Sequence, residues 1–238
     1  MTDKTDRPAA LCPFATDAEY VEYTLTGFIA ARVARISAEK ALWNATRSPS
    51  PKSNRILCRK KTSPANEAEQ RVNEALVREA HAVVEYAQRL EAHRQTPGSI
   101  KLGFDRTAEA FAINRDEELI LFALCAPAIC PSFAERTLGG LELRYFSGGL
   151  MVDDLITLLD PESLSDRIKF RQYFHRASRL NQHELISITF HGGLKTPDEF
   201  IEGQVKLSPV GFGFLLGLAP DFLAGESETV ADPRETQV

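Results

Sequence analysis

The chain has 238 residues, of which 43% are hydrophobic and 26% are charged, which is typical of a globular protein with one large domain or two small ones. Its formal net charge of −5 argues against a protein whose main role is to coat nucleic acid. Residues 1–100 carry 15 Lys and Arg against 12 Asp and Glu, so the acidic surplus lies in the rest of the chain.

The N-terminus has no apolar segment of the secretory type, and no apolar run approaches the roughly 18 residues that span a bilayer. The cysteines are scattered and form no C-x-x-C pair: Cys12, Cys58, Cys125 and Cys130. We therefore expect a cytoplasmic protein without a membrane segment, whose thiols stay reduced and bind no metal. Cys125 and Cys130 are expected to act as small hydrophobic residues on or just beyond an apolar helix.

Two long amphipathic helices are predicted in the first hundred residues. Thr16 and Glu19 have the spacing of a capping box, and apolar residues at helical spacing after them predict a helix over residues 17–46. Pro64 marks the first position of a second helix, where its missing N–H costs nothing. The apolar seam predicted for this second helix comprises Val72, Leu76, Ala80, Val83, Ala87 and Leu90.

From residue 99 onward the predicted elements are shorter. Capping residues, Gly and Pro delimit helices at 107–112, 114–126, 132–139, 151–159 and 165–177. Residues 184–190 then alternate between apolar and polar, which predicts a strand, with 204–207 as its partner. Ser208 and Pro209 begin a last helix, which Gly217 ends. Compact helices ahead of a two-stranded β-hairpin are the order of elements in a winged-helix domain.

The predicted fold is therefore mainly α: a long N-terminal helical hairpin followed by a winged-helix domain with a two-stranded β-hairpin. The hairpin is expected over residues 17–98, with an exposed Pro- and Ser-rich loop at 47–63. The winged-helix-like domain is expected over 99–220. Residues 1–16 and 221–238 are expected to be disordered, as the tail is too polar to pack.

No catalytic or cofactor-binding motif is complete in this sequence. The GGLKT run at 192–196 lacks the Gly that a phosphate-binding loop needs directly before its Lys, so a hairpin turn is expected there. Gly211 and Gly213 do not follow a βαβ pattern and predict close packing of the last helix against the hairpin. His183 and His191 would lie about 26 Å apart at opposite ends of one strand. We expect no catalytic residue, no cofactor and no metal site.

Two basic clusters are candidates for contact with phosphates or with a partner. The first lies in the predicted loop, has no interleaved aromatic residues and is expected to be solvated: Lys52, Arg55, Arg59, Lys60 and Lys61. The second lies on and after the helix predicted at 165–177: Arg167, Lys169, Arg171, Arg176 and Arg179. We take residues 152–159 as the helix placed to enter a DNA major groove. Because this helix carries Asp153 and Asp154 and no cation, the pattern favours protein binding over DNA binding.

Several stretches between residues 102 and 217 resemble a known family. In chain order they are FDRTAEAFAINRDEELILFALCAPAIC, SFAERTLGGL, LMVDDLITLLDP, RQYFHRASRLNQHELISI and KLSPVGFGFLLG. Together they resemble the winged-helix domain that precedes the ATPase module in a family of bacterial AAA-type ATPases, some of which occur with phage-tail-like contractile injection systems. The resemblance implies a winged-helix fold and an AAA ATPase or a larger assembly as partner. Walker A and Walker B motifs are absent from the chain, so the resemblance does not extend to ATP hydrolysis.

We therefore expect a non-enzymatic adaptor that docks onto a protein partner through the apolar seam of the hairpin and the sheet edge of the wing. The alternative is a DNA-binding transcriptional regulator that uses the second basic cluster to contact phosphates.

Overall fold

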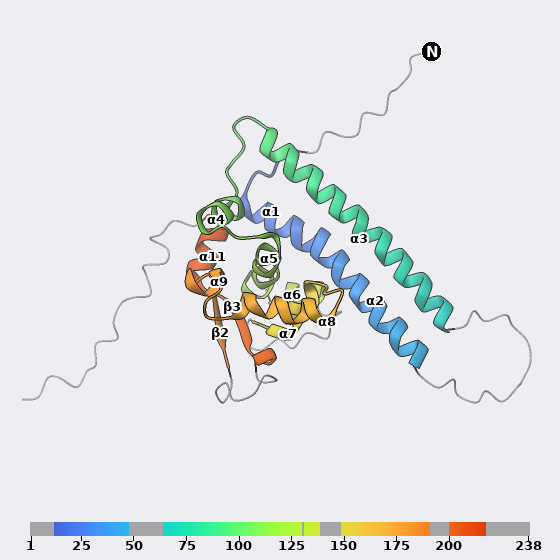
Figure 1. The fold of residues 1–238 in the computed structure, drawn as a ribbon. Coiled ribbons are helices and arrows are strands. Elements are labelled where there is room, and N and C mark those ends of the chain that lie inside the picture. Colours follow the sequence, from blue (N-terminus) through green and yellow to red (C-terminus); the bar gives the residue numbers. More distant parts are fainter. Residues whose placement is uncertain (1–11, 48–63, 130, 139–148, 191–199, 218–238) are drawn as a thin grey trace, which may run out of the picture.

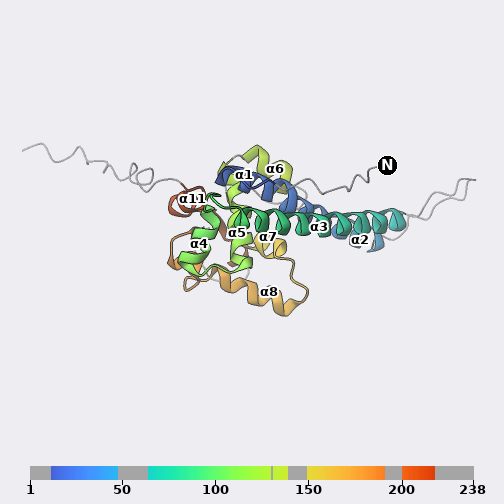
Figure 2. The same ribbon diagram turned by 90° about the horizontal axis from the view of Figure 1, so that it is seen from above.

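Helices dominate the molecule, and a small antiparallel sheet lies at one end of them (Figure 1). The computed structural model describes residues 12–47, 64–129, 131–138, 149–190 and 200–217. A long helical hairpin crosses the molecule and extends beyond the rest of it (Figures 1 and 2). Among the helices within these ranges, none combines the length and the apolar composition needed to cross a bilayer.

The hairpin has two long arms that lie side by side (Figure 1). The first arm is one continuous helix made of α1 (Asp17–Thr24), the π-helical turn η1 (Leu25–Ile29) and α2 (Ala30–Arg47). The second arm is α3 (Pro64–Gln95). Thr16 caps α1 by accepting the backbone N–H of Glu19 at 3.1 Å, as the capping-box spacing predicts.

The face of α3 that packs on α2 differs from the predicted seam. Leu76, Ala80 and Ala87 belong to the predicted seam, but all three are exposed. The buried residues of α3 are Ala68, Ala75, Glu79, Leu90 and His93, of which only Leu90 belongs to the predicted seam. Glu79 is buried because its carboxylate pairs with two arginines of α2. The apolar pattern alone therefore predicts only part of the buried face of this helix, since Leu90 is buried and Val83 packs against the core.

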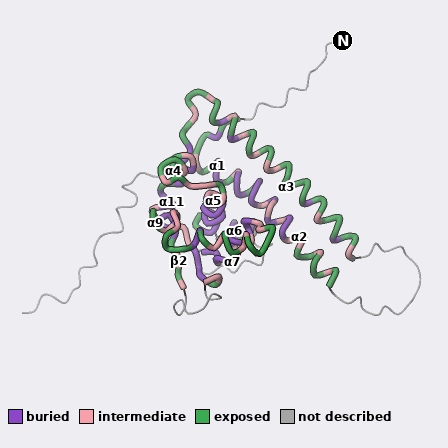
Figure 3. Tube along the Cα trace, viewed as in Figure 1, coloured by how far each residue is buried: buried purple, intermediate pink, exposed green. Residues whose placement is uncertain are grey.

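The hairpin and the shorter elements share one hydrophobic core. Its centre is α5 (Arg115–Ile129), in which every residue from 119 to 127 is buried. Figure 3 shows this helix and the inner side of the first arm as mostly buried. Flanking α5 are α4 (Gly103–Phe111) and α6 (Pro131–Leu138). The elements become shorter at the domain boundary predicted between residues 98 and 99. The hydrophobic core nevertheless continues across this boundary.

Phe14 lies within residues 1–16, which the composition predicts to be disordered. Its ring is only 2% exposed and packs against Tyr20, Tyr23 and His93. The expectation of disorder does not hold for Phe14, because an aromatic ring gains enough on burial to order the residues beside it. Most of the predicted loop, from 48 to 63, and the tail at 221–238 lie outside the described residues.

A helix-turn-helix and a three-stranded sheet complete the fold. The helix-turn-helix consists of α7 (Val152–Leu158) and α8 (Leu164–Phe170). The other helical elements of this part are the 3₁₀ turn η3 (Arg171–Phe174), α9 (Arg179–Gln182) and α11 (Pro209–Leu215). The strands are β1 (Leu150–Met151), β2 (Ile186–Thr189) and β3 (Gln204–Leu207).

The sheet has the order β1-β3-β2, and both pairings are antiparallel. In the register, Val205 of β3 lies between Leu150 of β1 and Ile188 of β2. The mainly α fold with a winged-helix layout is confirmed. The prediction of a two-stranded hairpin is incomplete, because β1 adds a third strand. Two residues are too few for a period-2 pattern to reveal a strand in the sequence.

Two predicted helices end differently in the structure. Pro127 was expected to end its helix at residue 126, yet α5 continues to Ile129 with Pro127 buried in its last turn, where the missing N–H removes one backbone bond. The helix predicted at 165–177 is interrupted, because α8 tightens into η3 and His175 is extended. This tightening buries Tyr173 and Phe174.

The last helix packs against the start of the β-hairpin through a glycine. Ser208 caps α11 by accepting the backbone N–H of Gly211 at 2.9 Å. A Cβ atom at Gly211 would overlap the backbone carbonyl of Leu185. The predicted close packing of this helix is confirmed, and it requires a residue without a side chain at position 211.

Candidate partner-binding surface

The order of the elements decides which helix occupies the recognition position. In a helix-turn-helix, the second helix is the one presented to a ligand. That helix is α8, because α7 comes first, directly after β1. The apolar face of α7 belongs to the core through Val152, Leu155, Ile156 and Leu158. The order of the elements therefore favours α8 over residues 152–159 as the recognition helix, and the apolar face of α7 belongs to the core.

α8 is a helix without a single buried residue. Leu164 is 74% exposed and Ile168 is 59% exposed, and their spacing of four places them on one face, which we call the α8 face. Figure 2 shows α8 at the edge of the molecule, on the side away from α1 and α6. Ser163 caps the helix by accepting the backbone N–H of Asp166 at 3.2 Å. The cap and the packing of Phe170 against the core hold the helix, while Leu164 and Ile168 stay in contact with water.

Two of the five candidate cations lie on α8 and are paired. Arg167 contacts Asp153 of α7 at 2.6 Å, and Lys169 contacts Asp166 at 3.5 Å. Both cations are more than a third exposed, so these pairs contribute little to stability. They nevertheless compensate the positive charge of α8 locally.

Arg179 has a structural role. Its guanidinium contacts the carboxylate of Glu117 at 2.9 Å, and the Glu117 side chain is only 2% exposed. It also donates to the backbone carbonyl of Ala112. These contacts join α9 to the start of α5, across 62 residues of sequence. The backbone N–H of Asn114 donates to the same carboxylate at 2.9 Å, so Asn114 and Glu117 form a capping box, as their spacing predicts.

The side chains of the remaining candidates, Arg171 and Arg176, make no ion pair or hydrogen bond within the part of the chain that the structure describes. Arg176 is exposed. Arg171 is half-buried, and its Nε has no hydrogen-bond partner among the described residues. Over residues 152–182 the sequence has five Asp and Glu and five Lys and Arg, so the helix-turn-helix segment is electrically neutral.

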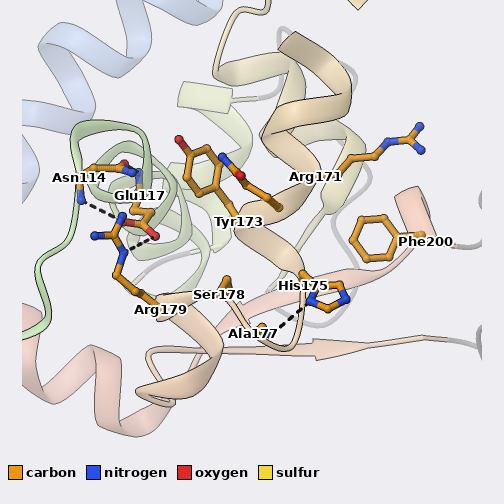
Figure 4. A pocket seen from close by; sticks show the side chains of 10 residues that line it. Asn114, Glu117, Arg171, Tyr173, His175, Ala177, Ser178, Arg179 and Phe200 are labelled. Atoms are coloured by element: carbon orange, nitrogen blue, oxygen red, sulfur yellow. Dashed lines mark hydrogen bonds and ion pairs between the residues drawn. The ribbon is translucent and has the colours of Figure 1, made fainter. Parts of the chain in front are cut away.

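An open pocket of about 550 Å³ lies beside η3 (Figure 4). Two of the five predicted cations, Arg171 and Arg179, line it. His175, Ser178 and Phe200 also line it, and no motif in the sequence points to them. They are the residue after η3, the N-cap of α9 and a residue of the segment before β3, so no spacing in the sequence indicates that they meet.

The other residues discussed as candidate ligands or reactive groups either have a structural role or lie outside the described residues. Cys125 is fully buried, and burial raises the pKa of its thiol to about 12, so it acts as a small hydrophobic residue as predicted. Among the described residues, no group of three or more His, Cys, Asp or Glu is positioned to hold a metal ion. The GGLKT run, His191, Cys58, Cys130 and the first basic cluster lie outside them.

Comparison with known proteins identifies the family. Over residues 2–223 the sequence matches the family described as "Winged helix domain, variant". The chain belongs to this winged-helix family. The assignment agrees with the antiparallel β1-β3-β2 sheet and with the short helices α7 and α8 between β1 and β2. No match was found among curated proteins or among solved structures. The family match concerns the winged helix and does not extend to AAA-type ATPases or contractile injection systems.

Proposed function

We propose that this winged-helix protein is a non-enzymatic cytoplasmic adaptor that docks onto another protein through the α8 face. The exposure of Leu164 and Ile168, on a helix of which only Phe170 packs against the core, carries the proposal. A recognition helix that reads DNA presents hydrogen-bonding groups to base edges and cations to phosphates. The α8 face presents two aliphatic side chains, each of which would gain about 1.5–3 kcal/mol on full burial against a partner.

The charges around α8 support a protein partner over DNA. A DNA-binding surface needs a surplus of cations, because release of counterions from the phosphates drives binding. Here the acidic and basic residues of the helix-turn-helix cancel. Arg167 and Lys169 already have carboxylates beside them, so a phosphate would have to compete with Asp153 and Asp166.

An AAA-type ATPase is the partner to test first, because the sequence resembles winged-helix domains that precede such ATPase modules. In this arrangement the chain supplies a docking surface, and the partner supplies nucleotide hydrolysis. The test measures binding of purified chain to a purified AAA ATPase by biolayer interferometry. The Leu164→Ser, Ile168→Ser double variant should bind at least about tenfold more weakly, equivalent to about 1.4 kcal/mol.

The matched control is Ile129→Ser, which removes an aliphatic side chain that is 49% exposed at the end of α5. Its affinity should stay within about twofold of wild type. Equal affinities of the double variant and wild type would remove α8 as the docking surface. An absence of binding by wild type would remove the ATPase as partner.

The alternative function, a DNA-binding regulator, is favoured by the unpaired cations Arg171 and Arg176. Fluorescence anisotropy with labelled random duplex at low and moderate salt separates the two functions. Non-specific DNA-binding proteins have dissociation constants of roughly 10⁻⁴–10⁻⁶ M at physiological salt. The adaptor proposal expects no saturable binding in this range. A salt-sensitive micromolar affinity that disappears in the Arg171→Ala, Arg176→Ala double variant would support the regulator and overturn the adaptor.

A further inference from the structure

The pocket beside η3 is lined by residues that take no part in the proposed docking of the α8 face. Its volume of about 550 Å³ is within the range of small-ligand pockets. Figure 4 shows Arg171, His175 and Phe200 toward one end and the Glu117–Arg179 ion pair at the other. The pocket therefore combines an aromatic ring with cationic and neutral polar groups.

The polar groups that remain free in the pocket are mainly donors. The Arg171 guanidinium has no acceptor in the described ranges, and its Nε is buried. Nδ1 of His175 accepts the backbone N–H of Ala177 at 3.3 Å, so the proton of the neutral ring lies on Nε2, which points to no acceptor in those ranges. Oγ of Ser178 accepts two N–H groups of Asn181, which leaves its own hydroxyl proton available.

The carboxylate that lines the pocket does not satisfy these donors. One oxygen of Glu117 accepts the backbone N–H of Asn114 and a guanidinium N–H of Arg179, each at 2.9 Å. The other oxygen accepts Nε–H of Arg179 at 3.3 Å. The charge of Glu117 is thus compensated, and the positive charge of Arg171 is left over. Gln172 adds an amide that can both donate and accept.

We infer that this pocket binds a single oxyanion, a carboxylate or a phosphate monoester, attached to a flat apolar body. Arg171 supplies the charge and charge-assisted hydrogen bonds at one end of the pocket, and His175 lies toward the same end, whereas Ser178 lies nearer Arg179 (Figure 4). The apolar body lies against the ring of Phe200. The terminal N–H groups of the Arg171 guanidinium have no acceptor among the described residues, and the bound oxyanion provides one. The pocket binds this group whether or not α8 docks onto a protein.

The inference is tested by titrating the ¹⁵N-labelled full chain with phenyl phosphate, benzoate and benzamide, followed by NMR. Benzamide is the matched neutral probe, because it keeps the ring and the carbonyl of benzoate but has no charge. Both anions should shift the Nε–H resonance of Arg171 and the backbone amides of residues 175–178 in a saturable manner. Benzamide should bind at least about tenfold more weakly. Tighter binding of phenyl phosphate than of benzoate assigns the site to phosphates, and equal or weaker binding assigns it to carboxylates.

Variants separate the pocket from the general charge of the surface. Arg171→Met keeps most of the aliphatic stem and should weaken both anions at least about tenfold. Lys169→Met removes a cation two residues away that does not line the pocket, and affinity should stay within about twofold. Circular dichroism establishes that both variants fold. If Arg171→Met does not fold, the comparison of benzoate with benzamide on the wild-type chain decides. Equal binding of benzamide, equal weakening by Lys169→Met, or shifts that do not saturate would overturn the inference.

Discussion

Replacement of Glu79 by Gln is expected to destabilise the protein by about 2–3 kcal/mol. Glu79 lies on α3 and is 8% exposed. Its carboxylate accepts Nε–H of Arg32 at 2.8 Å and Nε–H of Arg35. Arg35 is itself 6% exposed and also pairs with Glu39 and Asp160. This cluster joins both arms of the hairpin to the turn that follows α7.

The magnitude follows from what Gln retains and what it loses. Gln keeps the shape and one acceptor oxygen, but it loses the charge and turns an NH₂ group toward one of the two arginines. A hydrogen bond to a charged group contributes about 1.5–3 kcal/mol, and loss of one partner of a buried ion pair costs about 3–5 kcal/mol. The expected loss of about 2–3 kcal/mol is smaller than the loss for a fully broken buried ion pair. It is smaller because Arg35 keeps Glu39 and Asp160, whose side chains are 42% and 41% exposed. The Tm should fall by roughly 5–10 °C.

Differential scanning calorimetry and urea denaturation at pH 7 measure this loss. The matched control is Glu74→Gln on the same helix, where the exposed carboxylate accepts a hydrogen bond only from Gln70, at 2.9 Å, among the described contacts. The control should change stability by no more than about 0.5 kcal/mol. A loss below about 1 kcal/mol for Glu79→Gln, or a loss equal to that of the control, would refute the reasoning.

The same variant gives a pH test of the charge. Burial by itself would raise the pKa of Glu79, but hydrogen bonds from Arg32 and Arg35 outweigh burial and lower that pKa below its ordinary value. A carboxyl with a lowered folded-state pKa stabilises the fold above its unfolded pKa, and this contribution is lost as pH falls through the folded pKa. The difference between wild type and Glu79→Gln should be full above about pH 5 and shrink at lower pH. A difference that stays constant down to about pH 3 would contradict a role for the charge.

Glu118→Gln should raise the Tm at pH 7 and lose this gain near pH 4, because burial and then the charge of Asp105 raise the pKa of Glu118, so its ionised form at neutral pH is unfavourable in the folded state. Thermal melts at the two pH values check this, and a lower Tm at pH 7 would show that the carboxylate is needed. Gly211→Ala should cost about 1–3 kcal/mol in urea denaturation, because the added Cβ meets the carbonyl of Leu185. Gly27→Ala is its control: a Cβ there meets nothing within 4 Å, so stability should not fall, and an equal loss in both variants would contradict the packing argument.

The sequence indicated part of the candidate site. Clustering of cations drew attention to Arg171, which is the residue whose charge is left uncompensated in the pocket. The same clustering included Arg179, which the fold uses to hold Glu117. The exposed pair Leu164 and Ile168 on α8 was not predicted. Their spacing of four, on a segment rich in charged residues, nevertheless indicates an exposed apolar face. The use of any of these residues in binding remains a prediction.

What the sequence determined by itself is the local structure. The caps at Thr16, Asn114 and Ser208 depend on residues three positions apart, and the strand at 204–207 depends on an alternation of neighbours. Interactions over so few residues are read directly from their order, and they suffice to give helices, a sheet and hence the winged-helix class.

The tertiary structure decided which faces of those elements are buried and which charges are free. Burial of Glu79 depends on arginines 44 and 47 residues away, and the capture of Arg179 depends on a carboxylate 62 residues away. A charged side chain can be buried only where opposite charge meets it, and the chain order does not state which charges meet. For the same reason only the folded chain distinguishes α8 from α7 as the exposed helix and brings η3, α9 and Phe200 around one pocket.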